Sequence, residues 1–280
     1  MEPERVSLSR DLTLNDGRAM PRVGLGVWQA PAETTADVVA TSIAAGYRHI
    51  DTAAAYRNEA GVGEGVRRAG LPRDQVFVTT KLWNESQGYA SALAAFDASL
   101  KRLGLDYVDL YLIHWPAPRQ NRYVESWKAM IRLREEGRAR SIGVSNFAAE
   151  HLDRLIGETG VTPAVNQIEL HPAFQQRALR EADAARGIAT ESWSPLGRGG
   201  LLSNATIAAL GRKYGKTAAQ VIIRWHLQLG LIVIPKSVTP SRIAENFDVW
   251  DFELDADDLA AIAALDDPRG RMGPDPAAFG

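Results

Sequence analysis

Residues 76–114 read VFVTTKLWNESQGYASALAAFDASLKRLGLDYVDLYLIH. The stretch begins with a short run rich in β-branched residues (76–81), continues with apolar residues at helical spacing (89–103), and ends in a second strand-like run (107–114). Gly104 follows the helical part, where a left-handed residue commonly ends a helix. A strand, a helix and a strand in this order indicate two parallel strands joined by a helix.

The same unit repeats along the chain. Eight strand-like runs occupy residues 23–27, 47–51, 76–81, 107–114, 140–145, 164–169, 188–192 and 231–235. Helical spacing recurs at residues 34–45, 59–69, 89–103, 123–136, 148–159, 176–186, 217–229 and 240–246. Glycines mark the ends of most helical runs, at Gly46, Gly70, Gly104, Gly137, Gly160, Gly187 and Gly230. This repetition predicts an α/β fold, a (β/α)8 TIM barrel with its active site at the C-terminal ends of the strands.

An open, doubly wound parallel sheet is the alternative architecture. It would place a glycine-rich dinucleotide fingerprint after the first strand. Gly24-Leu25-Gly26 stands there, but without a third glycine and without the beginning of a helix. The barrel is therefore the favoured interpretation.

Three segments lie outside the repeat. The run at residues 6–14, followed by Asn15-Asp16-Gly17, predicts an N-terminal β-hairpin that closes one end of the barrel. Residues 197–214 lengthen the last interval between strands, and we expect an elaborated loop there with a short helical piece at 205–212. Residues 266–280 contain three prolines and three glycines, which predicts an irregular tail.

The composition is that of a soluble globular protein. The 280 residues are 45% hydrophobic and 24% charged, with a formal net charge of -2, and this balance gives no sign of a nucleic-acid partner. The absence of cysteine excludes disulfides, thiolate metal sites and a cysteine nucleophile. No apolar run is long enough for a signal peptide or a membrane span. We expect one domain over residues 1–280, in a cytoplasmic monomer that acts on a small molecule.

Polar and aromatic residues close the predicted strands. They are Trp28, Asp51, Lys81, His114, Ser145, Asn146, Asn166, Gln167, Glu169, Trp193 and Lys236. In a β/α barrel these strand ends meet at one mouth. Taken singly, Asp51 could cap a turn and His114 could be a core histidine, but a lysine is rarely buried without a partner. The combination therefore indicates a functional site.

Tyr56, just after Asp51, completes an acid–base set. An unperturbed tyrosine has a pKa of about 10, so it is a poor acid–base catalyst at neutral pH unless its phenolate is stabilised. Lys81 could lower the pKa of the tyrosine while Asp51 holds Lys81 in place. His114 could bond a substrate oxygen. The set predicts Tyr56 as a proton donor with the other three residues in support.

These residues stand in motifs that resemble the aldo-keto reductase superfamily over essentially the whole chain. The motifs are GYRHIDTA (46–53) with Tyr56, TTKLW (79–83), DLYLIHWP (109–116), IGVSNF (142–147), NQIE (166–169), SPLG (194–197) and IPKS (234–237). Trp193, where most members have tyrosine, resembles the bacterial branch that includes 2,5-diketo-gluconic acid reductases. Arg57 departs from the usual glycine, and it could favour an anionic substrate or simply lie at the surface.

The resemblance implies an oxidoreductase with an NADPH site at the barrel mouth. It implies that Ser145, Asn146 and Gln167 hold the nicotinamide carboxamide and that Trp193 stacks on the ring. It also implies cofactor contacts from Ser194, Leu196, Gly197, Lys236, Ser237, Val238, Arg242, Glu245 and Asn246.

Residues 236–242 favour NADPH over NADH for a physical reason. A predicted strand ends and a helix begins here, so backbone N–H groups and the positive helix end face the mouth. Lys236, Ser237 and Arg242 could bond a 2′-phosphate, which NAD lacks. The alternative is the ordinary phosphate-binding loop of a barrel, which would not imply hydride transfer.

We therefore predict an NADPH-dependent reductase of aldehydes, dicarbonyls or keto sugars such as 2,5-diketo-gluconate. The substrate pocket is predicted to be walled by Trp28, Trp83 and Trp115, although tryptophans could equally pack in the core. One alternative is an NADPH-binding regulatory subunit with little turnover, which has no need of a proton donor. Another is a metal-dependent barrel hydrolase with His114, Asp51 and Glu169 as ligands, which the small number of histidines, five in all, disfavours. We expect no metal.

Overall fold

The computed structural model describes residues 8–280, and its centre is a barrel of eight parallel strands. The strands are β3 (Leu25–Gly26), β4 (His49–Asp51), β5 (Phe77–Leu82), β6 (Val108–Ile113), β7 (Ala139–Ser145), β8 (Val165–Glu169), β9 (Ala189–Trp193) and β10 (Ile232–Val233). They pair in chain order. Hydrogen bonds from Gly24 N to Val233 O (2.9 Å) and from Val233 N to Arg22 O (2.8 Å) join the first strand to the last. The predicted (β/α)8 barrel is confirmed.

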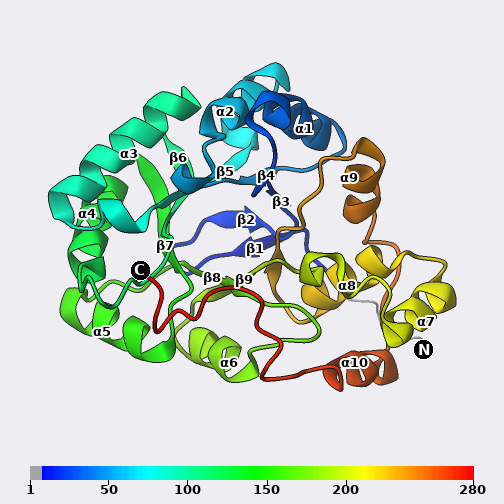
Figure 1. Ribbon diagram of the computed structural model, residues 1–280. Coiled ribbons are helices and arrows are strands. Elements are labelled where there is room, and N and C mark those ends of the chain that lie inside the picture. Colours follow the sequence, from blue (N-terminus) through cyan, green and yellow to red (C-terminus); the bar gives the residue numbers. More distant parts are fainter. Residues whose placement is uncertain (1–7) are drawn as a thin grey trace.

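Helices form the outer layer around this barrel (Figure 1). They are α1 (Ala32–Ala44), α2 (Glu59–Arg68), α3 (Tyr89–Leu103), α4 (Tyr123–Glu135), α5 (Ala149–Thr159), α6 (Arg177–Ala185), α7 (Ala205–Tyr214), α8 (Ala218–Gln228), α9 (Pro240–Phe247) and α10 (Ala256–Ala263). Every residue of β5 and β6 is buried, as expected of strands covered on both faces. Gly104 ends α3 at φ 63, and its N–H bonds Leu100 O at 2.8 Å.

The N-terminal hairpin is also present. β1 (Asp11–Thr13) and β2 (Ala19–Pro21) pair antiparallel and lie across the barrel axis in Figure 1. Met20 is fully buried in one cluster with Phe77, Val165 and Ile232, which lie at or near strand beginnings. The hairpin therefore closes the end of the barrel opposite the predicted site. Residues 6 and 7 of the predicted run lie outside the described residues.

The structure differs from the prediction mainly at the ends of elements. β3 and β10 have two residues each instead of five, because their contact consists of the isolated bridges Val23↔Val233 and Gly26↔Lys236. Helix α10 was not predicted, and α7 continues to Tyr214. Beyond α10 the tail contains no further helix or strand, as predicted. None of the described helices is long and apolar enough to cross a bilayer.

Candidate active site

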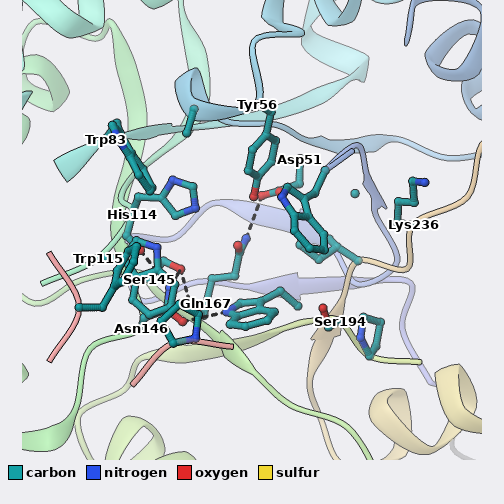
Figure 2. A pocket seen from close by; sticks show the side chains of 18 of the residues that line it. Asp51, Tyr56, Trp83, His114, Trp115, Ser145, Asn146, Gln167, Ser194 and Lys236 are labelled. Atoms are coloured by element: carbon teal, nitrogen blue, oxygen red, sulfur yellow. Dashed lines mark hydrogen bonds between the residues drawn. The ribbon is translucent and has the colours of Figure 1, made fainter. Parts of the chain in front are cut away.

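The carboxyl ends of the strands surround a cavity of about 390 Å³ (Figure 2). The predicted site residues in its wall are Trp28, Asp51, Tyr56, Trp83, His114, Trp115, Ser145, Asn146, Gln167, Trp193, Ser194 and Lys236. The wall also contains residues that were not predicted, namely Gly26, Ala55, Pro195, Arg198, Ile234, Pro274 and Phe279. The barrel thus brings to one mouth side chains as distant in the sequence as Trp28 and Lys236, which are 208 positions apart.

Lys81 and Asp51 form a buried ion pair at the ends of β5 and β4. Lys81 Nζ lies 2.5 Å from Asp51 Oδ1, and the side chains are 0% and 2% exposed. The ammonium also donates to Thr52 O (2.9 Å) and to Tyr56 Oη (3.4 Å). Burial lowers the pKa of Lys81, but Asp51, Tyr56 and Glu191 together raise it by more, so the net shift is upward. All three N–H groups have partners, so the charge is tolerated in the interior.

The Tyr56 hydroxyl keeps its proton. Burial raises its pKa, and the Lys81 ammonium opposes that rise without reversing it. Lys81 thus lowers the pKa of Tyr56, as expected, but loss of water around the hydroxyl outweighs the attraction of the ammonium for the phenolate. A neutral hydroxyl beside a cation can still donate a proton to an oxygen that gains negative charge.

His114 enters the cavity as a neutral ring. It is 8% exposed, and burial, together with the Lys81 ammonium, lowers its pKa well below the usual value. Its ring centroid lies 5.7 Å from that of Tyr56 and 5.1 Å from that of Trp83. Nδ1 has no hydrogen-bond partner among the described residues. A neutral histidine can donate one hydrogen bond to a ligand oxygen without adding a second positive charge.

Arg57 follows Tyr56 at the end of a short 3-10 turn (Ala54–Tyr56). Its φ is 58, in the left-handed region that glycine adopts without strain. The side chain is exposed and lines a separate surface hollow. It does not belong to the cavity wall. The left-handed backbone explains why glycine is usual at this position.

Ser145, Asn146, Gln167 and Trp193 form a connected polar wall. Ser145 Oγ donates to Gln167 O (2.8 Å). Asn146 Nδ2 donates to His114 O (3.0 Å) and to Ser145 Oγ (3.0 Å), and Asn146 Oδ1 accepts from Trp193 Nε1 (2.8 Å). The orientation of the Trp193 indole is therefore fixed by Asn146. The wall is held together by its own hydrogen bonds.

Positive charge collects at the other end of the cavity. Lys236 is exposed in the wall, just before α9, which has Pro240 at its first turn. Arg198, in the loop after β9, also lines the wall, and its guanidinium carbon lies 5.3 Å from the ring centroid of Trp28. Arg198 was not predicted, and its only sequence signal is a cation among glycines in a loop after a strand.

The remaining residues implied as cofactor contacts lie outside the cavity wall. Leu196 and Gly197 follow β9, Ser237 and Val238 precede α9, and Arg242, Glu245 and Asn246 are on α9. Arg242 and Val238 are exposed. Glu245 accepts a hydrogen bond from Thr217 Oγ1 (2.9 Å). Ser237 and Val238 follow Lys236 directly in the chain, and the cofactor contacts of all these residues stay predictions.

The C-terminal tail closes one side of the cavity. Glu169, at the end of β8, accepts the backbone N–H groups of Met272 (2.6 Å) and Gly273 (2.8 Å). This attachment holds Phe279 in the wall, where its ring centroid lies 4.7 Å from that of Trp115. Figure 1 shows the tail crossing the barrel end, in red. The sequence predicts an irregular tail but gives no sign of this position.

The three tryptophans predicted to wall the pocket all line the cavity. Trp28 is 39% exposed and Trp115 is 6% exposed. The tryptophans that serve the core are different ones, Trp127 and Trp225, which are almost fully buried. The core alternative therefore does not apply to Trp28, Trp83 or Trp115.

The ligands named for a hydrolase are not arranged as a metal site. Asp51 pairs with Lys81, and Glu169 holds the tail. Over residues 8–280, no three His, Asp or Glu side chains gather in a way that could hold a metal ion. The hydrolase alternative has no metal site in this part of the chain.

The fold and the site together define a class, a β/α-barrel enzyme with a tyrosine, a buried lysine–aspartate pair and a histidine at its mouth. Comparison with known proteins identifies the family. The sequence pattern of the Aldo/keto reductase family matches residues 22–267, and the chain belongs to this family. The predicted resemblance is confirmed, and with it the prediction of an oxidoreductase.

Relatives match the chain over nearly its whole length. An aldo-keto reductase of Mycolicibacterium smegmatis is 60% identical over 97% of this chain and 98% of its own. The methylglyoxal reductase DkgA of Escherichia coli is 56% identical over 96% of this chain and 98% of its own. The structure of a Gox0644 mutant in complex with NADPH is 54% identical, with a TM-score of 0.93 over 96% of this chain and 98% of that one.

Proposed function

We propose that this protein reduces aldehyde and ketone carbonyls with NADPH, with Tyr56 as the proton donor. The observation that carries the proposal is the placement of the Tyr56 hydroxyl at the cavity, 3.4 Å from the buried Lys81 ammonium. A neutral acid next to a fixed cation suits proton transfer to a forming alkoxide. Membership of a reductase family supports the same reaction.

The cavity has the groups that NADPH requires. Both N–H groups of the Gln167 amide bond within the protein, which leaves its Oε1 as an acceptor for a carboxamide. Lys236 and Arg198 supply positive charge for phosphates at the other end. Two solved relatives support this choice, the Gox0644 mutant in complex with NADPH and a Bombyx mori aldo-keto reductase in complex with NADP.

The residues of this chain divide the proton chemistry among them. When bound, NADPH supplies a hydride. Tyr56 donates its proton to the carbonyl oxygen, and the Lys81 ammonium stabilises the phenolate that remains. Asp51 holds the ammonium in position. His114, being neutral, donates a hydrogen bond to the carbonyl oxygen and orients it toward Tyr56.

The aromatic walls support small substrates. The polar groups of Tyr56 and His114 lie at one side of the cavity, and aromatic side chains make up much of the remaining wall, namely Trp28, Trp83, Trp115 and Phe279. A compact carbonyl compound therefore fits better than a long apolar one. DkgA is named a methylglyoxal reductase. We propose small aldehydes, dicarbonyls and keto sugars such as 2,5-diketo-gluconate. The single domain, the monomeric state and the cytoplasmic location stay predictions.

A panel of carbonyl compounds tests this function. We expect methylglyoxal and small aldehydes to be reduced with NADPH, followed by loss of its absorbance, and NADH to support much slower reduction because it lacks the 2′-phosphate. Tight NADPH binding without turnover of any compound in the panel would contradict the proposal and favour the regulatory alternative.

Arg242→Ala tests the basis of cofactor choice. We expect the KM for NADPH to rise about tenfold, as for loss of one charge-assisted hydrogen bond, and the KM for NADH to stay nearly constant. Arg212→Ala is a matched control, because Arg212 is an exposed arginine on α7. Equal changes for both cofactors would show that Arg242 does not bind the 2′-phosphate.

A further inference from the structure

A second buried carboxyl group lies beside the ion pair, and the mechanism proposed above does not use it. Glu191 is on β9, paired in register with Gln167 on β8. Its side chain is fully buried and does not line the cavity. The sequence motifs described above assign it no role.

Glu191 shares a hydrogen-bond donor with Asp51. The Nε2 atom of Gln167 lies 2.8 Å from Asp51 Oδ2 and 2.8 Å from Glu191 Oε2. An amide nitrogen has two N–H groups, so both are committed to the two carboxyl groups. A flipped amide would place its oxygen against two carboxyl oxygens. The pair therefore determines that Gln167 Oε1 faces the cavity.

Among the described residues, the two carboxyl groups share a single cation, the Lys81 ammonium. Lys81 Nζ is 2.5 Å from Asp51 Oδ1. His49 Nε2 is 3.6 Å from Glu191 Oε1, but burial and the Lys81 ammonium lower the pKa of His49 to about 3, so the ring is neutral. Tyr56, the other titratable neighbour, is also neutral. Two carboxylates this close cannot both ionise at little cost beside a single ammonium.

The proton belongs on Glu191. Its Oε1 has no hydrogen-bond partner among the described residues, whereas both oxygens of Asp51 are bonded. Burial and the neighbouring Asp51 raise the pKa of Glu191 to about 8. At neutral pH the group is therefore mostly a neutral acid that accepts a hydrogen bond and adds no charge.

We propose that Glu191 is a positioning residue for the carbonyl reduction site, and that it works in its protonated form by holding Gln167 with its Oε1 toward the cofactor cavity. The inference rests on the proposed function. Ionisation of Glu191 would add a negative charge near Asp51, Lys81 and Tyr56. That charge opposes formation of the Tyr56 phenolate, so activity should fall as the pH rises through about 8.

Two substitutions test the holding role. Glu191→Leu removes the acceptor, whereas Glu191→Gln keeps it and cannot ionise. We expect the leucine variant to raise the Kd for NADPH about tenfold, measured by quenching of tryptophan fluorescence, and the glutamine variant to stay within about twofold of the parent at pH 6.5. An unchanged Kd in a folded leucine variant, or a glutamine variant as weak as the leucine one, would overturn the holding role.

The pH dependence tests the protonated form. We expect kcat of the parent to fall above about pH 8 and that of Glu191→Gln to continue undiminished to a higher pH. A group whose pKa is raised on folding stabilises fully below its unfolded pKa and loses that contribution as the pH rises through the folded value. The urea midpoint of the parent should therefore fall between about pH 5 and 9 relative to that of Glu191→Gln.

The stability measurement needs no turnover, so it separates this inference from the proposed function. A parent that reduces no carbonyl but shows the expected difference in urea midpoint contradicts the function and leaves the protonated Glu191 in place. If the urea midpoints of the parent and of Glu191→Gln change in parallel between about pH 5 and 9, Glu191 is not protonated in the folded protein, whatever the activity.

Discussion

Replacing Tyr56 with phenylalanine is expected to lower kcat for aldehyde reduction by at least about a hundredfold, since a positioned general acid contributes about 10²–10⁴-fold. The substitution removes only Oη, the atom that lies 3.4 Å from Lys81 Nζ. The ring and its contact with His114 remain, so the cavity keeps its shape. Burial holds the pKa of Tyr56 above its usual value, and the proton is therefore available to the parent over the whole neutral range.

Cofactor binding distinguishes lost chemistry from lost structure. The Kd of Tyr56→Phe for NADPH should stay within about twofold of the parent value, because Tyr56 acts on the carbonyl oxygen in the transition state. Tyr89→Phe is the matched control, since Tyr89 is 39% exposed at the start of α3. A folded Tyr56→Phe protein that binds NADPH and reduces aldehydes as fast as the parent would remove Tyr56 from the mechanism.

The barrel can be predicted from the sequence because its signals are local. Each strand-like run is followed by a helical run, most helical runs end at a glycine, and α3 has the predicted bounds. The element that escapes prediction has a weak local signal. Helix α10 has eight residues, and its core contacts are made by Leu259 and Ile262, too few for a helical periodicity to stand out.

The site is predictable only where the barrel fixes positions in advance. Asp51, Lys81 and His114 close successive strands, so the fold alone brings them to one mouth. Phe279 reaches the same cavity through the contact of Glu169 with a residue 103 positions away, and no local pattern encodes such a contact. The protonation of Glu191 is similarly hidden, because it depends on how many cations share its surroundings.

The Lys81 ammonium supports stability as well as chemistry, and its removal should show both. We expect Lys81→Met to lower the free energy of unfolding by about 3–5 kcal/mol, the range for breaking a buried ion pair. The substitution leaves Asp51, 2% exposed, with a charge that no cation offsets. Carbonyl reduction should fall by at least about a hundredfold, because the phenolate of Tyr56 loses its stabilising charge. Urea denaturation and a turnover assay measure the two effects.

The double variant Asp51→Asn/Lys81→Met separates the loss of stability from the loss of activity. With both charges removed, no uncompensated carboxylate remains, so at least half of the lost stability should return while activity stays absent. In the single variant, burial raises the pKa of Asp51 above its unfolded value without opposition from an ammonium, so stability is kept at low pH and lost as the pH rises. The free energy of unfolding that Lys81→Met loses relative to the parent should therefore be smaller at about pH 5 than at about pH 8. Two results would contradict this account: a loss in free energy of unfolding that does not depend on pH, or a double variant no more stable than Lys81→Met. Either would mean that the methionine disrupts packing and that the ion pair does not stabilise the mouth of the barrel.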